Sequence, residues 1–279
     1  MLLSSLYLFN LLYTHPSLTL QVMEVIQIPR CVSYIYDTIG RSNQITSGFH
    51  SLCYGEITPA SLQYLWHELV RLSLVSSGIS SMLELGSGVG KPSFHFSSFF
   101  RCLTVGIEVD YSLYFASLGN LQRIYSKADE LGFSAPSVAF LNEDIFEMTS
   151  FDPFEIIYSF DKLFEPKLLM HIAKVFNDST KCKVFITYQR PSVLEEAGFL
   201  HLSLQSKLQM KMVGSGEMKT CYIFTRRSVV DPRRSESSPD PIVREVLKKY
   251  SNGSLIEANK TLDVHCLGTR RNTRSSGMA

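Results

Sequence analysis

Short apolar segments alternate with longer amphipathic segments from residue 81 to residue 188. Strands are expected at 81–85, 103–109, within 137–144, at 154–160 and at 182–188. Helices are expected between them at 91–100, 111–131 and 166–176. Strands joined through helices run in the same direction, so this alternation predicts an α/β fold with a mostly parallel sheet and helices on both faces.

The C-terminal part of this region follows a different pattern. Residues 207–227 hold two alternating apolar runs around the tetrapeptide GSGE, which is the signal of a β-hairpin. A parallel sheet closed by an antiparallel hairpin is typical of class I S-adenosylmethionine (SAM) methyltransferases, which have a Rossmann-like sheet, and nucleotide dehydrogenases do not usually end this way. Upstream, Thr58 followed by Pro59 marks the start of a helix. Trp66, the single tryptophan, lies on the apolar face of that helix and is expected to pack in the core.

A glycine-rich turn joins the first expected strand to the next helix, in the sequence MLELGSGVGK. The glycines Gly86, Gly88 and Gly90 remove side chains where a ligand would approach the backbone. The third glycine comes one position earlier than in the dinucleotide fingerprint G-x-G-x-x-G. The turn therefore indicates a nucleotide-like ligand without the usual pyrophosphate pattern.

Acidic residues follow or end three successive expected strands. Glu84, two residues before the first glycine, would repel a pyrophosphate but suits the ammonium group of a methionine moiety. Glu108 ends the second strand, where an acid accepts hydrogen bonds from both ribose hydroxyls. Asp144 follows the third strand, where it could accept from an adenine amino group. Together with the glycine turn, these acids predict SAM as the cofactor, without a metal.

Methyl transfer from SAM requires positioning of the nucleophile more than acid–base catalysis. The sulfonium already makes the methyl group electrophilic, so the protein must align a neutral nucleophile and exclude water. A lysine amine has an ordinary pKa near 10.4, which desolvation in an apolar channel lowers.

Two blocks of sequence resemble the disruptor-of-telomeric-silencing (Dot) family of histone H3 lysine methyltransferases. LELGSGVGK resembles the family's D-L-G-S-G-V-G-Q motif, and YGEITP resembles its Y-G-E-[LT] loop, which closes over SAM. The similarity spans about residues 45 to 227, and the compact size resembles the kinetoplastid branch. The resemblance implies a non-SET enzyme whose substrate is a lysine in the globular region of H3 in the nucleosome, and it implies a nuclear chromatin regulator.

The resemblance also implies roles for particular residues. The cofactor-binding residues would be Tyr54, Gly55, Glu56, Ile57, Met82, Leu83, Glu84, Leu85, Gly86, Ser87, Gly88, Val89, Gly90, Lys91, Glu108, Asp144 and Ile145. Tyr54, Phe164 and Tyr222 would wall the lysine channel, with Phe164 and Pro166 matching the family's N-N-F-A-F-G-P stretch. Core packing is the alternative for Phe164 and Tyr222.

The chain departs from the family pattern at three points. Lys91 stands where the family usually has Gln. An asparagine expected near Phe160 and Asp161 is missing. The closing hairpin lacks the family's Trp and has one tyrosine, Tyr222. These departures indicate an altered channel.

Composition bounds the domain organisation. The chain has 279 residues and a net charge of +1, but from Arg226 onward eleven Lys or Arg accompany six Asp or Glu. We expect an N-terminal extension at 1–44, a methyltransferase domain at 45–227, and a basic, mostly flexible tail at 228–279 that could contact DNA or another polyanion. The apolar residues 1–13 lack the positive region of a secretory signal and are too short to span a membrane confidently, so no membrane partner is expected. A functional start at Met23 is an alternative.

Cysteine usage favours a reducing compartment. None of the six cysteines forms a C-x-x-C pair or has the spacing of a zinc finger, and several lie in apolar runs. This pattern favours the cytosol or the nucleus and indicates no metal site.

Other functions stay open at this stage. One is a class I methyltransferase acting on RNA or a small molecule, although no N-P-P-Y or D-P-P-Y motif follows the fourth strand. Another is a SAM-binding chromatin protein with an impaired channel. A nucleotide dehydrogenase would bind NAD and not SAM.

Overall fold

The computed structural model describes residues 30–39, 56–75, 80–131, 136–214 and 216–227, together with Asp240, Pro241, Val243, Arg244 and Lys248. The helices are α3 (Arg30–Ile39), α4 (Pro59–Arg71), α5 (Lys91–Phe100), α6 (Tyr111–Leu131), the 3-10 helix η4 (Ile145–Glu147), α7 (Pro166–Asp178) and α8 (Pro191–Glu196). The strands are β1 (Ser81–Leu85), β2 (Leu103–Ile107), β3 (Val138–Leu141), β4 (Ile156–Ser159), β5 (Val184–Thr187), β6 (Leu202–Lys211) and β7 (Met218–Arg226).

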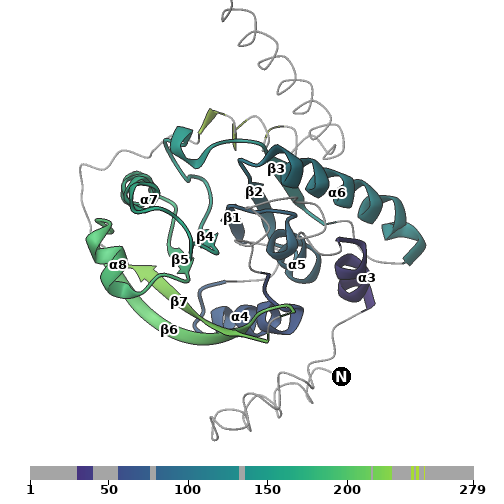
Figure 1. Cartoon of the computed structure of the whole chain (residues 1–279), viewed down its shortest axis with the longest axis horizontal. Coiled ribbons are helices and arrows are strands. Elements are labelled where there is room, and N and C mark those ends of the chain that lie inside the picture. The colour runs from purple at the N-terminus through teal and green to yellow at the C-terminus, as the bar shows by residue number, and fades with distance from the viewer. Residues whose placement is uncertain are drawn as a thin grey trace, which may run out of the picture.

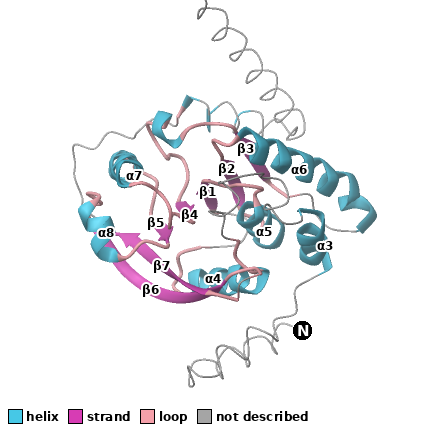
Figure 2. Ribbon diagram, in the orientation of Figure 1, coloured by secondary structure: helices cyan, strands magenta, loops and turns pink. Residues whose placement is uncertain are grey.

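These strands form one sheet in the order β3-β2-β1-β4-β5-β7-β6 (Figures 1 and 2). The first five are parallel, and β7 inserts antiparallel between β5 and β6. The order reverses at β1 and β4, the switch point where open α/β sheets bind ligands beyond the carboxyl ends of their strands. The fold class predicted from the sequence is confirmed: the sheet is that of a Rossmann-like class I SAM methyltransferase, closed by an antiparallel hairpin.

Helices cover both faces of the sheet. Helices α7 and α8 pack on one face, in a core that includes Phe176, Phe185 and Leu194. Helices α4 and α5 pack on the other face, and α3 and α6 join α5 there. Figure 1 shows α7 and α8 on the left of the sheet and α3, α5 and α6 on the right. Because both faces are covered, the central strands are apolar on both sides, which explains why they appear as continuous apolar runs in the sequence.

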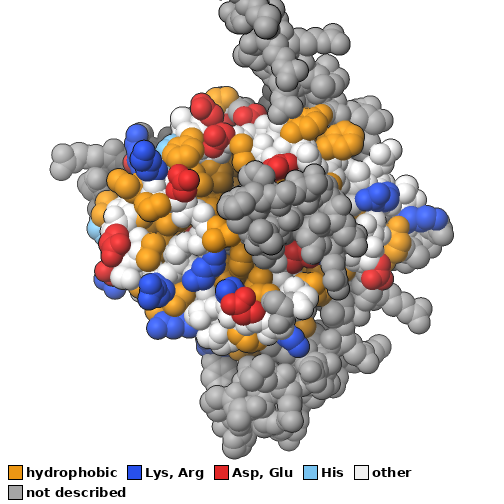
Figure 3. Space-filling view, viewed as in Figure 1, with side chains coloured by type: hydrophobic (Ala, Val, Ile, Leu, Met, Phe, Trp, Pro, Cys, Tyr) orange, Lys and Arg blue, Asp and Glu red, His pale blue; other side chains and the backbone are white. Residues whose placement is uncertain are grey.

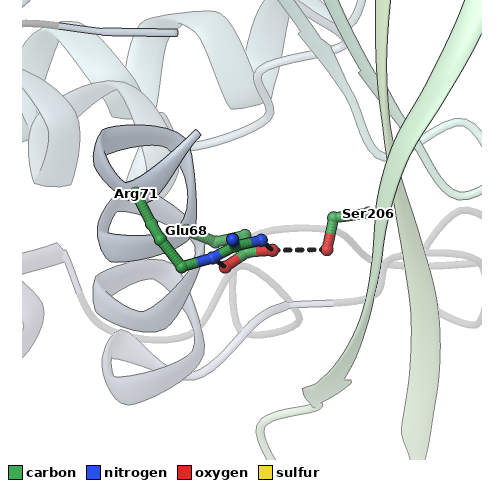
Figure 4. A network of polar contacts seen from close by, with 3 residues as sticks. All are labelled: Glu68, Arg71 and Ser206. Atoms are coloured by element: carbon green, nitrogen blue, oxygen red, sulfur yellow. Dashed lines mark hydrogen bonds and ion pairs between the residues drawn. The ribbon is translucent and has the colours of Figure 1, made fainter. Parts of the chain in front are cut away.

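Helix α4 begins as predicted and ties the hairpin to the body. The Thr58 hydroxyl caps the helix by accepting from the Ser61 backbone N–H, and Pro59 is its first residue. Trp66 stacks on Phe100 of α5 with ring centroids 4.0 Å apart, so its predicted core role is confirmed. Glu68, paired with Arg71, accepts a 2.5 Å hydrogen bond from the Ser206 hydroxyl of β6 (Figure 4).

Two features of the fold were not expected. Helix α8 follows β5, where no helix was expected from the sequence. Residues of the segment expected to be a tail also pack against the domain: Val243 is buried in the core beside η4 and α7, and Asp240 accepts hydrogen bonds from Thr149. Residues beyond 227 therefore contribute to the packing of the domain.

The described cysteines and helices bear on two further expectations. Cys102, Cys182 and Cys221 are buried free thiols, as expected for cysteines in apolar runs, while Cys53 and Cys266 lie outside the described residues. Among the helices that the structure describes, none has the length and apolar character needed to cross a membrane.

Gly106 of β2 is packed so tightly that any side chain there would collide. A Cβ at this position would lie 2.7 Å from Ser87 Cβ and 2.8 Å from Phe140 Cδ1. The glycine turn can rest on β2 only because this position has no side chain. Gly119 of α6 offers a contrast, since a Cβ there would meet nothing within 4 Å.

We therefore predict opposite effects of alanine at these two glycines. Gly106→Ala should destabilise the fold by about 1–3 kcal/mol through overpacking. Gly119→Ala should stabilise it by about 0.5–1 kcal/mol, because glycine is unfavourable inside a helix. Chemical denaturation of both variants measures the difference, and equal stabilities for the two would contradict the packing described for Gly106.

Candidate functional site

A cavity of about 390 Å³ opens at the carboxyl ends of β1, β2 and β4. Its lining comprises Glu56, Ile57, Glu84, Gly86, Lys91, Pro92, Ile107, Glu108, Val109, Asp110, Leu113, Asp144, Ile145, Tyr158, Phe160, Leu163, Phe164 and Leu168. Ionisable groups gather toward β1, β2 and α5, and apolar groups gather toward β4 and the loop that follows it.

The glycine turn reaches the cavity at Gly86 and is anchored on β2. The backbone N–H groups of Gly86 and Ser87 both donate to the Ile107 carbonyl, at 2.9 and 2.8 Å. Gly90 has a φ of +84°, in the left-handed region, and a Cβ there would lie 2.3 Å from Phe140 Cζ. The turn therefore needs glycine both for its backbone conformation and for its packing.

Glu108, just after β2, holds the turn from the side. One of its carboxylate oxygens accepts from the Gly88 backbone N–H at 2.7 Å, and the other accepts from Asp110 N–H at 2.9 Å. Burial raises the pKa of Glu108 above its usual range, and these hydrogen bonds partly offset that rise. The carboxylate lines the cavity while bracing the turn.

Glu84 lies on β1 under the start of α5. One carboxylate oxygen accepts from both the backbone N–H and the hydroxyl of Ser93, at 3.0 and 2.6 Å. The residue is only 3% exposed, and its burial raises the pKa of the carboxyl to about 8, although the Ser93 bonds lower it. At neutral pH Glu84 is therefore largely protonated, and a cationic group beside it would stabilise its charged form.

Lys91, the first residue of α5, forms an ion pair with Glu56 across the cavity wall. The segment that carries Glu56 is also bonded to the tip of the hairpin, because Val213 N–H donates to the Glu56 carbonyl at 2.7 Å. Ile57 forms an antiparallel bridge with Met212. Glu56 and Ile57, the described part of the predicted loop, are thus held between the hairpin and α5.

Asp144 and Ile145 line the side of the cavity beyond β3. Asp144 caps the 3-10 helix η4 by accepting from Phe146 N–H at 2.9 Å with one carboxylate oxygen. Phe146 in turn packs against His171 of α7, with ring centroids 5.4 Å apart. The two predicted residues therefore both line the cavity.

The loop after β4 supplies the apolar side. Phe164 lies against the glycine turn, so that a Cβ on Gly86 would come within 3.2 Å of its ring, and Leu163 beside it is 63% exposed. Among the described lining residues there is no histidine or cysteine, so no imidazole or thiol base faces this side. Such a surface suits a nucleophile that loses its proton through desolvation.

Asp161 follows Phe160 in this loop, at the point where the asparagine was missing, but it does not line the cavity. Its side chain is buried, accepts from the Thr187 hydroxyl, and accepts from Tyr188 N–H at 2.9 Å. Burial raises its pKa to about 6, and the hydrogen bonds from Thr187 and Tyr188 oppose that rise. Asp161 joins the ends of β4 and β5.

The remaining predicted residues divide into four groups. Met82, Leu83, Leu85 and Val89 are buried core residues behind the cavity, and Ser87, Gly88 and Gly90 shape the turn without lining it. Tyr222 packs in the core on β7, near Phe224 and under the ammonium of Lys207, and it is not part of the cavity lining. Tyr54 and Gly55 lie outside the described residues.

Some lining residues were missed in the sequence. Val109 and Asp110 directly follow Glu108, and Leu113 lies in the first turn of α6, so their position after a strand end was the available signal. Tyr158 and Leu168 looked like ordinary core residues, and only the sheet geometry brings them to the cavity. In the described part of the chain, no group of three or more His, Cys, Asp or Glu side chains could hold a metal ion.

No protein-family model matches the chain, and no curated protein matches it in sequence. Among solved structures it is similar to magnesium protoporphyrin IX methyltransferase (ChlM) from Synechocystis PCC 6803 with bound SAM, at 12% identity over 61% of this chain and 79% of that one, with a TM-score of 0.44. It is also similar to a TehB-like SAM-dependent methyltransferase from Corynebacterium glutamicum, at 16% identity over 61% and 100%, with a TM-score of 0.38. A third is TrmN from Thermus thermophilus, at 15% identity over 61% of this chain and 49% of that one, with a TM-score of 0.43. Likenesses this distant carry no argument about the acceptor, so the site has to be judged from its own residues.

Proposed function

We propose that this chain is a SAM-dependent methyltransferase. The observation that carries the proposal is the cavity itself, in which acids at the ends of three neighbouring strands face a glycine turn at the switch point of the sheet. Glu84 is the most informative of them, because a buried carboxyl beside the turn disfavours a pyrophosphate and favours a cation. The cofactor would carry that cation as its α-ammonium group.

The residues present fit the parts of this cofactor. Glu84 would accept from the ammonium, Glu108 from the ribose hydroxyls, and the second oxygen of Asp144 from the adenine amino group. SAM, when bound, supplies an electrophilic methyl group on its sulfonium. Phe160, Leu163 and Phe164 would exclude water from the acceptor and hold it in line.

For the acceptor we propose a lysine amine in the globular region of histone H3 in the nucleosome. The support is the pair of motifs LELGSGVGK and YGEITP, together with the apolar surface after β4. Desolvation by such a surface lowers the pKa of an amine and favours its neutral, nucleophilic form. A nuclear location follows from this substrate, and no membrane partner is proposed.

A nucleosomal partner would be polyanionic, and the hairpin adds support for such a partner. Strands β6 and β7 carry Lys207, Lys211 and Lys219, of which Lys219 pairs with Glu217 in the turn between the strands. Arg226 of β7 donates inward to the Phe176 and Ser179 carbonyls and is not part of this surface. In Figure 3, Lys and Arg side chains gather at the lower left, over the region of this hairpin. Together with the basic tail, this surface would contact DNA phosphates, and such binding would weaken with salt.

A second candidate is methyl transfer to RNA or a small molecule. It is favoured by Tyr222 and Asp161, which pack away from the cavity rather than forming a polar lysine channel. The same two residues would also suit a SAM-binding chromatin protein with an impaired channel.

The first prediction concerns cofactor binding. Glu108→Ala should weaken the binding of S-adenosylhomocysteine (SAH) about 100-fold, because charge-assisted hydrogen bonds to the ribose are lost. Isothermal titration calorimetry measures this change. Glu155→Ala, which removes a partly exposed surface ion pair with Lys183, is the matched control and should bind as the wild type does. Unchanged affinity in Glu108→Ala would contradict the assigned ribose site.

The second prediction concerns pH. Burial raises the pKa of Glu84 to about 8, so at pH 6 the carboxyl is protonated. An ammonium group beside it lowers that pKa, so binding releases a proton and SAH affinity should rise from pH 6 to pH 8. The rise is at most about tenfold per pH unit, and it levels off above pH 8, where the Glu84 carboxyl is already ionised without the ligand. In Glu84→Gln this rise should be absent, and an unchanged pH profile would argue against the role of Glu84.

The third prediction concerns the acceptor. Radiolabelled SAM should label H3 in assembled nucleosomes, and Gly86→Arg should abolish the label by filling the cavity beside Phe164. Gly119→Arg, on a position of α6 with open space around it, should retain the label. Label in RNA alone would overturn the histone proposal and support the second candidate. SAH binding without label in any acceptor would favour the non-catalytic alternative.

A further inference from the structure

The ion pair between Lys91 and Glu56 is the least expected feature of the cavity. The two residues are 35 positions apart, and their side chains are only 6% and 9% exposed. Both line the cavity. Neither the pattern of strands and helices nor the resemblance explains a lysine at this position, where the related motif ends in glutamine.

A buried ion pair in a cavity wall needs a reason, because removing two charges from water is costly and the attraction often only offsets that cost. Here the ammonium of Lys91 lies at the N-terminus of α5, where the helix dipole already favours an anion and not a cation. A lysine at this end of a helix is therefore electrostatically unfavourable unless an anion accompanies it. Glu56 is that anion in this structure.

Glu84, which also lines the cavity, requires a positive charge where Lys91 requires a negative one. That carboxyl is buried, and burial keeps its proton on in the absence of a cation. A cation would stabilise the charged form of the Glu84 carboxyl, and an anion stabilises the ammonium of Lys91 on α5. An α-amino acid zwitterion carries both charges on adjacent groups.

We propose that Lys91 selects the cofactor by its α-carboxylate, and that Glu56 is an internal competitor which occupies Lys91 until the cofactor arrives. On binding, the carboxylate would replace Glu56 as the partner of Lys91, while the ammonium pairs with Glu84. The exchange would also release one of the contacts that hold the segment at Glu56 against α5, leaving its backbone bond to Val213 of the hairpin. This inference rests on the proposal that SAM is the ligand.

If this exchange occurs, substitutions of Lys91 and of Glu56 change the affinity for the ligand in opposite directions. Removing Lys91 removes the partner of the carboxylate, so affinity should fall only for ligands that carry this group. Removing the charge of Glu56 removes the competitor, so affinity for those ligands should rise. If Glu56 bound the cofactor directly, or if the pair were only a structural brace, removal of either residue would weaken binding.

The experiment compares SAH with its decarboxylated analogue, S-adenosyl-3-thiopropylamine, by calorimetry. The wild type should prefer SAH by about 10- to 100-fold, the range expected for a hydrogen bond between charged groups. Lys91→Met should lose most of this preference while binding the analogue within about threefold of the wild type. Glu56→Gln should bind SAH about three- to tenfold more tightly and leave the analogue nearly unchanged.

Thermal melting gives a second readout that does not depend on calorimetry. Glu56→Gln leaves Lys91 buried without its anion, so the ligand-free variant should melt below the wild type, and saturating SAH should raise its melting temperature by more than it raises that of the wild type. Lys183→Met and Glu155→Gln, which break the surface pair, serve as matched controls and should change neither preference nor the SAH-induced shift.

The outcomes separate this inference from the proposed function. A wild-type protein that binds neither SAH nor the analogue overturns the proposed function. A wild type that binds both equally overturns the inference alone, as does Lys91→Met if it weakens both ligands to the same extent. Weaker SAH binding in Glu56→Gln would overturn the role of Glu56 as a competitor.

Discussion

The attachment of the glycine turn to the end of β2 determines where the other parts of the site lie. Two consecutive backbone N–H groups, from Gly86 and Ser87, share the Ile107 carbonyl, and the Glu108 carboxylate accepts the N–H of Gly88. These bonds fix the exit of the chain from β1 and therefore the start of α5. Because they depend on close approach of two backbones, they would fail if Gly106 on β2 carried a side chain. A single glycine outside the motif is thus as necessary as those within it.

The distribution of charge in the cavity follows from this attachment. With the turn fixed, Glu84 lies under the first turn of α5 and Lys91 faces the cavity from its N-terminus. Each group is buried at an electrostatic cost that a packed apolar core would avoid. Carboxyl groups whose pKa is raised by burial, as that of Glu84 is, concentrate at functional sites. The cavity wall is better explained as a binding surface for a charged ligand than as a means of stabilising the fold.

The sequence predicted the framework well and the contacts less well. The strands, the helix at Pro59 and the acids at the strand ends follow from periodicity and chain order, which are local properties. The pairing of Lys91 with Glu56 could not be predicted, because it requires the hairpin tip to hold a segment 35 residues from α5. The orientation of the Asp161 side chain could not be predicted either, because its partners lie on or directly after the next strand of the sheet. Each miss involves a side chain whose orientation depends on two elements meeting in space.

The two halves of the cavity constrain function to different degrees, because they are built from different kinds of structure. The cofactor half is built from strand ends and a backbone turn, so few sequences satisfy it, and its residues point to one kind of ligand. The acceptor half is built from apolar side chains on the loop after β4, with Leu163 largely exposed. Apolar surfaces of this kind exclude water without recognising a particular nucleophile. Under the proposed function, acceptor choice would therefore depend on surfaces outside the cavity, such as the lysines of β6 and β7.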